Sequence, residues 1–458
     1  MRDKQMNSSR RNFGPMSERT LENAQIHLLS TRYDLSRDSL LAGEIVRYVN
    51  HALDEEEKQR GIIRVRPGEL FLKTSHGDLI LPIRTPEDIE RAILGERLDG
   101  IRRDILDRCL KSYHRSFPAT GATELESAEI EKIMRALMLS RGFFKKYKSG
   151  HGINTIPIRE KSYGPVDEEL MGRLLNDAKS VGLSVSQRVS NMELSHRSET
   201  KREIIDFLGH EACIPPAIRE PMFLSLARVR AHFCPLSSTL RSGQMPLVSM
   251  HVKSGRRLEL PTRLQPLAPV VVTIITPQEL EELGQKSSFE YSELMEFHAR
   301  RMARVLVEAY QQDGLISYSE LQWCFLASAN RIGRILGWYQ HKHNVILPCP
   351  GTVLDMGRML THKDIIVRLY LKGMTVLEIS RQTYHAPRSV DAYLKVFDSV
   401  LILHLYNLPL KLISRVLNRG ESLIEEYLDL VKENLKEVGE IRIYLQSRGI
   451  KLPKETVA

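Results

Sequence analysis

The sequence predicts a mainly α-helical protein with α+β parts in the N-terminal half and tandem helix-turn-helix units in the C-terminal third. Three observations support this fold class. Apolar residues recur mostly at helical spacing, two short regions near residues 62–83 and 246–276 are rich in β-branched residues, and the C-terminal third repeats itself. At about 150 residues per domain, 458 residues predict roughly three domains.

The N-terminal segment 1–17 is polar and basic without periodicity, which predicts a disordered tail. A small α/β module is expected over 18–115. Within it we expect two helices between residues 18 and 56, then strands at 62–65, 69–72 and 79–83. Thr85-Pro86 followed by two acids is typical of a helix start, with a hydroxyl cap and proline in the first turn.

The middle of the chain predicts a helical region over 116–210 and a mixed region with a β-hairpin over 211–290. The expected helices include 124–139 and 166–179. Between them, residues 141–148 interleave basic and aromatic side chains, which favours either a nucleic-acid contact or a helix end with a cationic last turn. The hairpin strands are expected at 247–252 and 258–260, followed by a buried strand at 270–275 and a capped helix after Thr276.

A repeat of 34 residues is the strongest internal signal. Leu369–Phe397 aligns without gaps with Leu403–Val431. Seven positions are identical: Leu369/Leu403, Leu371/Leu405, Ile379/Ile413, Ser380/Ser414, Arg381/Arg415, Tyr393/Tyr427 and Leu394/Leu428. Because this period also suits helical solenoids, the period alone does not decide the fold.

The local pattern of residues 360–398 predicts a helix-turn-helix unit. Gly373 ends one helix, a short helix follows from Thr375, and a second helix begins at Pro387 after a brief turn. The exposed face of that second helix carries small and basic residues, which suit a reader of the DNA major groove: Arg388, Ser389, Asp391, Ala392 and Lys395.

A first unit is expected over 291–350 and a third over 399–435. In the first unit, the second helix begins at Ala329, is capped by Ser328 and is expected to expose Asn330, Arg331 and Arg334. The basic residues 341–344, Lys342 among them, lead into the strand-like residues 345–347, as in a winged variant. The third unit carries Glu421, Glu425, Glu426 and Asp429, which phosphates would repel, so we expect it to pack or to form a homodimer. Residues 436–458 predict a C-terminal helix and tail.

Several of these segments resemble a known family. They are residues 302–316, with Gln312-Asp313-Gly314, residues 361–371, and Ser389-Val390 with residues 393–397. Over about 295–435 the chain resembles the uncharacterised prokaryotic family called "domain of unknown function 1670", often met in mobile-element settings. The family usually has Gln-Gly-Gly at 312–314, Ser at Ala386 and Arg-Thr-Ile at 330–332. The resemblance implies DNA binding through its helix-turn-helix content and brings no catalytic residues.

No pattern of residues predicts an enzyme, a cofactor or a metal site. Phosphate loops, nucleophile elbows and dinucleotide-binding turns are absent from the sequence, and no carboxylate series indicates a two-metal nuclease. His210, Cys213, His232 and Cys234 are donor types, but the single residue between the last two is awkward for zinc, so core thiols and solvated histidines are favoured. Cys324 lies on an expected inner helix, which favours core burial over catalysis. Five scattered cysteines without a secretory signal indicate a cytoplasmic protein, and no apolar run is long enough to span a membrane.

The net charge of +9 is concentrated in one region. Residues 297–398 hold 13 Lys and Arg against 8 Asp and Glu, which indicates a polyanionic partner there. We therefore predict a non-enzymatic protein that binds double-stranded DNA, either a transcriptional regulator or an accessory factor of a mobile element. The expected contacts are Asn330, Arg331, Arg334, Lys342, Lys363, Arg388, Ser389 and Lys395. Two alternatives stay open: a transposase-like or recombinase-like enzyme, and a helical-repeat scaffold for protein interaction.

Overall fold

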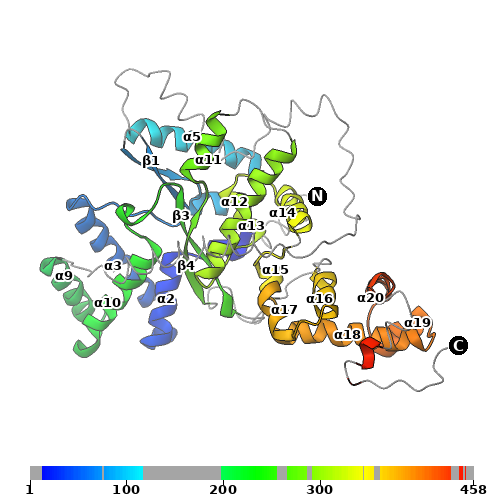
Figure 1. Ribbon diagram of the computed structural model, residues 1–458. Coiled ribbons are helices and arrows are strands. Elements are labelled where there is room, and N and C mark those ends of the chain that lie inside the picture. Colours follow the sequence, from blue (N-terminus) through cyan, green and yellow to red (C-terminus); the bar gives the residue numbers. More distant parts are fainter. Residues whose placement is uncertain are drawn as a thin grey trace. The chain divides into compact units, whose positions relative to one another are not determined.

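A computed structural model describes residues 13–74, 77–116, 197–254, 266–285, 291–343, 345–354, 362–434, 443–446 and 449 (Figure 1). The chain divides into two compact units, 1–344 and 345–458. The predicted helices at 124–139 and 166–179, the basic and aromatic segment 141–148 and the strand at 258–260 lie outside the described residues. The expected fold class is confirmed: the described part is mainly helical with a small antiparallel sheet.

The sheet of the first unit has five strands in the order β2-β1-β3-β4, with β5 paired to β3. All pairs are antiparallel. The bounds of the strands are β1 Glu69–Thr74, β2 Gly77–Pro82, β3 Gln244–His251, β4 Leu267–Thr273 and β5 Gly314–Leu315. Strands expected in the module 18–115 and in the mixed region 211–290 therefore belong to one sheet.

A helix packs against each end of this sheet. α5 (Leu98–Ser116) contacts β2, and α12 (Tyr291–Gln311) contacts β4. α4 (Pro86–Ile93) and α11 (Pro277–Gln285) begin where the sequence predicted capped helices. Thr85 and Asp88 form a reciprocal capping box, and Thr276 and Glu279 exchange hydrogen bonds of 2.8 and 3.2 Å in the same way.

Four helices surround a separate apolar core in the first unit (Figure 1). The two helices predicted between residues 18 and 56 are present as α2 (Leu21–Arg32) and α3 (Ser39–Gln59), joined by the short turn η1 (Leu35–Arg37). They pack against α9 (Ser198–His210) and α10 (Pro216–Phe233). Apolar side chains such as Leu53, Leu208 and Phe223 are buried between them, as their helical spacing requires.

Two single helical turns and the first helical pair are further described elements of the first unit. The pair consists of α13 (Tyr318–Cys324) and α14 (Ala329–His343), which contact each other. A capping box between Ser317 and Glu320 fixes the start of α13. The two remaining single turns are η2 (Ser237–Thr239) and η3 (Val252–Ser254).

The described elements of the second unit are helices. They are α15 (Pro350–Val353), α16 (His362–Leu371), α17 (Val376–Thr383), α18 (Pro387–Leu405), α19 (Leu410–Leu417) and α20 (Glu421–Asn434). The 34-residue repeat is realised residue by residue: α19 and α20 begin 34 positions after α17 and α18. The stop at Gly373 (φ +91) recurs at Asn407 (φ +55), where an amide side chain tolerates the left-handed conformation.

Three local predictions are wrong. Residues 13–17 belong to a helix rather than a disordered tail, because the side chains of Phe13 and Met16 are buried. The rings of Phe13 and Trp323 pack edge to face, with 5.9 Å between their centres. Residues 62–65 form one isolated bridge, at Arg64, rather than a strand, since the opposite segment contains Pro235, which has no N–H.

The third wrong prediction is the wing. Residues 345–347 carry no regular secondary structure. No strand of the described residues pairs with them, and Pro348 lacks the N–H that a ladder would need. Among the described residues, the strand expected at 345–347 therefore does not follow the first helical pair.

Candidate nucleic-acid interface

The second helical pair, α17 and α18, is held in a fixed geometry by local hydrogen bonds. Thr375 and Glu378 form a capping box at the start of α17. At its end Tyr384 adopts a left-handed conformation, and the Ser380 hydroxyl donates to the carbonyl of His385 at 2.6 Å. The equivalent Ser414 hydroxyl donates to the carbonyl of Arg419 at 2.5 Å. The repeated Ser therefore closes the turn in both copies and directs the following helix.

The first turn of α18 is exposed and carries no acidic residue. Its capping residue, Ala386, makes no side-chain cap. Pro387 has no N–H and the N–H of Ser389 donates to the Ala386 carbonyl at 2.8 Å, so in this turn the N–H of Arg388 is the one without an acceptor among the described residues. Arg388 is exposed and forms no hydrogen bond or ion pair with any residue that the structure describes. Ser389 is half-buried beside it. This combination can accept an anion such as a phosphate.

Two other predicted cations of the second unit are already paired. Lys363 is only 13% exposed, and its Nζ lies 2.6 Å from a carboxylate oxygen of Glu426 and 5.7 Å from the centre of the Tyr427 ring. Lys395 is 76% exposed and pairs with Asp391 one turn earlier at 2.7 Å. Lys363 thus joins α16 to the acidic helix α20, whereas the exposed ion pair of Lys395 is weak enough to open.

The predicted residues of the first helical pair differ in exposure and in their contacts. Asn330 and Arg334 are exposed on α14. Arg331 was expected to be exposed but is half-buried, and its charge lies close enough to the buried His298 to lower the pKa of that histidine further than burial already does. Lys342 pairs with Glu296 at 2.8 Å and stacks on the Trp338 ring at 4.9 Å.

The eight predicted residues are therefore divided between the two units, four in each. Within the second unit, the sequence analysis did not include Arg381 among the expected DNA contacts. It is exposed on α17, one helix before Arg388. Its recurrence in the repeat did not single it out, because Arg381 and its counterpart Arg415 both lie in the last turn of a helix, where a cation suits the helix dipole.

The third helical pair differs in charge at the equivalent place. α20 begins with Glu421, at the position that Pro387 occupies in α18, and Glu425 is exposed on its face. Two of its acids face cations of α16: Glu426 pairs with Lys363, and Glu433 lies 3.5 Å from Arg368. An acid in the first turn suits the helix dipole and opposes the approach of a phosphate.

The described residues contain no group of three or more His, Cys, Asp or Glu side chains arranged to hold a metal ion. Of the four donors considered above, Cys234 is buried, and its thiol has a pKa raised by burial to about 12. Cys213 is exposed at a left-handed backbone position. Cys324 is buried, as its place on α13 predicted. In the part of the chain that the structure describes, no helix is both long and apolar enough to cross a membrane.

The segment Gln312-Asp313-Gly314 has a structural explanation. The Gln312 side chain donates to the Val271 carbonyl at 2.8 Å and accepts from its N–H at 2.9 Å, so it completes the outer edge of β4 as a strand would. Asp313 has φ +62, a conformation that explains the family's usual glycine there. A Cβ on Gly314 would lie 2.3 Å from the Ser249 hydroxyl, so a side chain cannot be placed there.

These observations define a class: a mainly helical protein with a small antiparallel sheet, whose C-terminal part repeats a short helix followed by a longer one. Residues 224–430 match the model of a family described as "Protein of unknown function (DUF1670)". The match confirms the resemblance drawn from residues 295–435 and extends it to the last part of α10 and to strands β3 and β4. Neither a curated protein nor a solved structure matches the chain.

Proposed function

We propose that the protein binds double-stranded DNA through its first two helical pairs, as a cytoplasmic transcriptional regulator or an accessory factor of a mobile element. The observation that carries this proposal is the start of α18. Its first turn contains no acid and carries the exposed Arg388, which forms no hydrogen bond or ion pair with any residue that the structure describes. A cation in the first turn opposes the helix dipole, and an external anion would offset that unfavourable interaction.

The contacts are divided by exposure. Arg388 and Arg381 in the second pair, and Asn330 and Arg334 in the first, are exposed and supply the direct contacts. Arg388 and Asn330 lie in first turns, where side chains reach base edges when the helix end enters the major groove. Lys342 and Lys395 reach phosphates by exchanging their exposed ion pairs. Lys363 supports the fold, because its charge is engaged by Glu426.

The test compares two positions of the repeat. Arg381 and Arg415 are both exposed and occupy the same position of α17 and α19. Fluorescence anisotropy with a labelled random duplex measures affinity for each variant. We expect Arg388→Ala and Arg381→Ala each to weaken binding about tenfold, equal to about 1.4 kcal/mol. Arg415→Ala, the matched control beside the acidic helix, changes affinity less than about twofold.

Salt provides a second, independent measurement. If six or more phosphates are contacted, affinity falls roughly 10³-fold or more between about 50 and 200 mM salt. Equal losses for Arg381→Ala and Arg415→Ala, or an affinity that salt does not change, would contradict the proposal. Cleavage or joining of the labelled duplex in Mg²⁺ favours the nucleic-acid enzyme instead.

We also propose that the third helical pair joins two copies of the chain. α19 exposes Leu412 and Val416, which lie one turn apart and are 41% and 59% exposed. Each directly follows an exposed basic residue, Lys411 or Arg415. The neighbouring α20 exposes acids, so the pair offers an apolar strip with complementary charges to a second copy of itself. Light scattering is expected to give a dimer for the wild-type chain and a monomer for Val416→Asp. Leu377→Asp, on the equally exposed Leu377 of α17, is the control and stays dimeric.

A further inference from the structure

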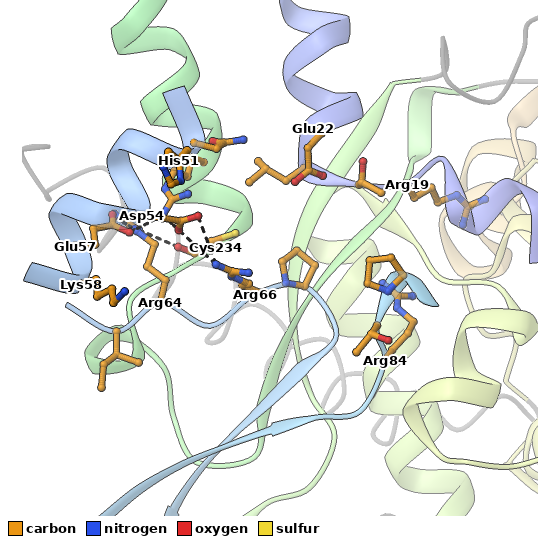
Figure 2. Close-up of a pocket in the computed structure, with 18 of the residues that line it drawn as sticks. Arg19, Glu22, His51, Asp54, Glu57, Lys58, Arg64, Arg66, Arg84 and Cys234 are labelled. Carbon is orange, nitrogen blue, oxygen red and sulfur yellow. Dashed lines mark hydrogen bonds and ion pairs between the residues drawn. The ribbon is translucent and has the colours of Figure 1, made fainter. Parts of the chain in front are cut away.

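The first unit contains a cavity of about 850 Å³ that the DNA-binding proposal does not use (Figure 2). Its walls come from the segment 16–22, the second half of α3, the residues before β1, the start of α4, and the end of α10. Figure 2 shows two groups of charged side chains in it. Asp54, Glu57 and Arg64 lie at one end, and Arg19 and Arg84 lie at the other.

The first end is internally neutralised. Glu57 accepts from Arg64 at 2.6 Å and from the buried Arg230 at 2.5 Å, and Arg230 also donates to Asp54 at 2.8 Å. Arg66, which is 67% exposed, adds a weak contact of 3.4 Å to Asp54. Each carboxylate at this end therefore has a cation within reach, and the end calls for no further partner.

The second end has an excess of positive charge. The side chain of Arg84 is buried, with 8% of the residue exposed, and its guanidinium forms no hydrogen bond or ion pair with any residue that the structure describes. The neighbouring carboxylate, Glu320, is engaged by Arg19 at 2.9 Å and by the Ser317 hydroxyl at 2.8 Å. The nearby thiol of Cys324 stays protonated, because burial raises its pKa to about 12. Arg84 and Arg19 thus share the Glu320 carboxylate, and the two other carboxylates that line the cavity near them, Glu22 and Glu90, form no ion pair with either arginine.

A buried guanidinium that makes no direct ion pair and only shares a nearby carboxylate is unfavourable, and arginine does not relieve this by losing its proton at neutral pH. Burial lowers the pKa of Arg84, and the adjacent positive charge of Arg19 adds to that effect, while the group remains charged. An anion that enters the cavity would supply the missing charge. Arginine is the side chain best matched to the oxygens of a phosphate, because its planar fork donates two parallel hydrogen bonds.

We propose that this cavity binds a small phosphorylated molecule, with the phosphate against Arg84 and Arg19. A volume of about 850 Å³ leaves room for the rest of a metabolite-sized ligand. Polar side chains such as Asn50 and His51 line the remainder and suit hydroxyl groups. The described lining contains no Phe, Tyr or Trp, so nothing is placed to stack a base, and a sugar phosphate fits better than a nucleotide. The buried position of Arg84 excludes the backbone of a nucleic-acid strand.

Titration calorimetry with the full chain tests this site, with glucose 6-phosphate and inorganic phosphate as probes and glucose as the uncharged control. We expect saturable binding of glucose 6-phosphate and weaker binding of inorganic phosphate. Arg84→Gln is expected to reduce affinity at least tenfold and to leave the unliganded protein as stable as the wild type or more stable. Arg47→Gln, at an exposed arginine of α3 outside the cavity, is the matched control and binds as the wild type does.

Three outcomes overturn the inference. One is the absence of saturable binding by either phosphate. Another is wild-type affinity in Arg84→Gln. The third is a lower stability of unliganded Arg84→Gln, which would mean that the arginine serves the fold rather than a ligand. If Arg84→Gln fails to fold, Arg84→Lys keeps the charge without the planar fork, and an unchanged affinity in that variant counts against the site.

Discussion

Gln312→Ala tests whether the segment Gln312-Asp313-Gly314 serves the fold. The Gln312 amide donates to the Val271 carbonyl and accepts from the Val271 N–H at the outer edge of β4. Val271 is 2% exposed, so water cannot readily replace both bonds. Leaving a buried polar group unsatisfied costs about 1–3 kcal/mol, and two groups are affected. Because Gln312 is only half-buried, we take the lower part of that range and expect a loss of about 2–4 kcal/mol in the free energy of unfolding.

Tryptophan fluorescence during urea denaturation measures this loss in the right part of the chain. The chain has two tryptophans, Trp323 and Trp338, and both belong to the unit 1–344 that contains Gln312. Gln311→Ala is the matched control: the neighbouring glutamine forms no side-chain hydrogen bond with any described residue, so a change below about 0.5 kcal/mol is expected. Equal effects of the two substitutions would refute the structural explanation and make the segment a candidate for function.

Three further predictions concern stability and reactivity. Lys363→Met is expected to lower the free energy of unfolding of the unit 345–458 by about 1 kcal/mol or less, because Glu426 is partly exposed; denaturation followed by circular dichroism measures this loss. The affinity for duplex DNA is expected to stay at the wild-type level. A tenfold loss of affinity would show instead that Lys363 contacts DNA. Burial, and then the charge of Arg301, lower the pKa of His298 well below its usual value. Its contribution to the free energy of unfolding is therefore complete above about pH 6.5 and is lost as the pH falls below that value. In His298→Gln, the free energy of unfolding measured by fluorescence should depend less on pH between about pH 7 and 5, and an unchanged pH dependence would contradict this. Of the five cysteines, only Cys213 is exposed, so a thiol reagent should label one site rapidly, and Cys213→Ser should abolish that phase but not the slower ones.

The sequence predicted the parts of the fold that depend on local chemistry. The repeat gave the register of α17, α18, α19 and α20, because a left-handed stop and an inward Ile379 or Ile413 must recur at the same spacing for the helices to pack. The capped starts of α4 and α11 followed from a hydroxyl and an acid three residues later, which is a local hydrogen-bond pattern.

The parts that failed depend on distant partners. Phe13 and Met16 are single apolar residues in a polar segment, and only contact with distant side chains such as Trp323 makes them core. Among the proposed DNA contacts, composition identified the cations but not their counter-charges. Lys363 and Glu426 are 63 positions apart in sequence, so their ion pair is a property of the folded unit. Arg388 has no ion pair with a described residue, and the first turn of its own helix contains no acid that could pair with it.

The caps of the repeated pairs distinguish a possible binding surface from a packing surface. In the first two pairs a reciprocal capping box fixes the short helix, Ser317 with Glu320 and Thr375 with Glu378. The following helix of the second pair begins at Pro387 after Ala386, which makes no side-chain cap, and its first turn carries Arg388 and no acid. In the third pair both features are reversed, since α19 has no capping box and α20 starts with an acid. Had all three pairs served packing alone, there would be no physical reason for the caps and the charges to change together.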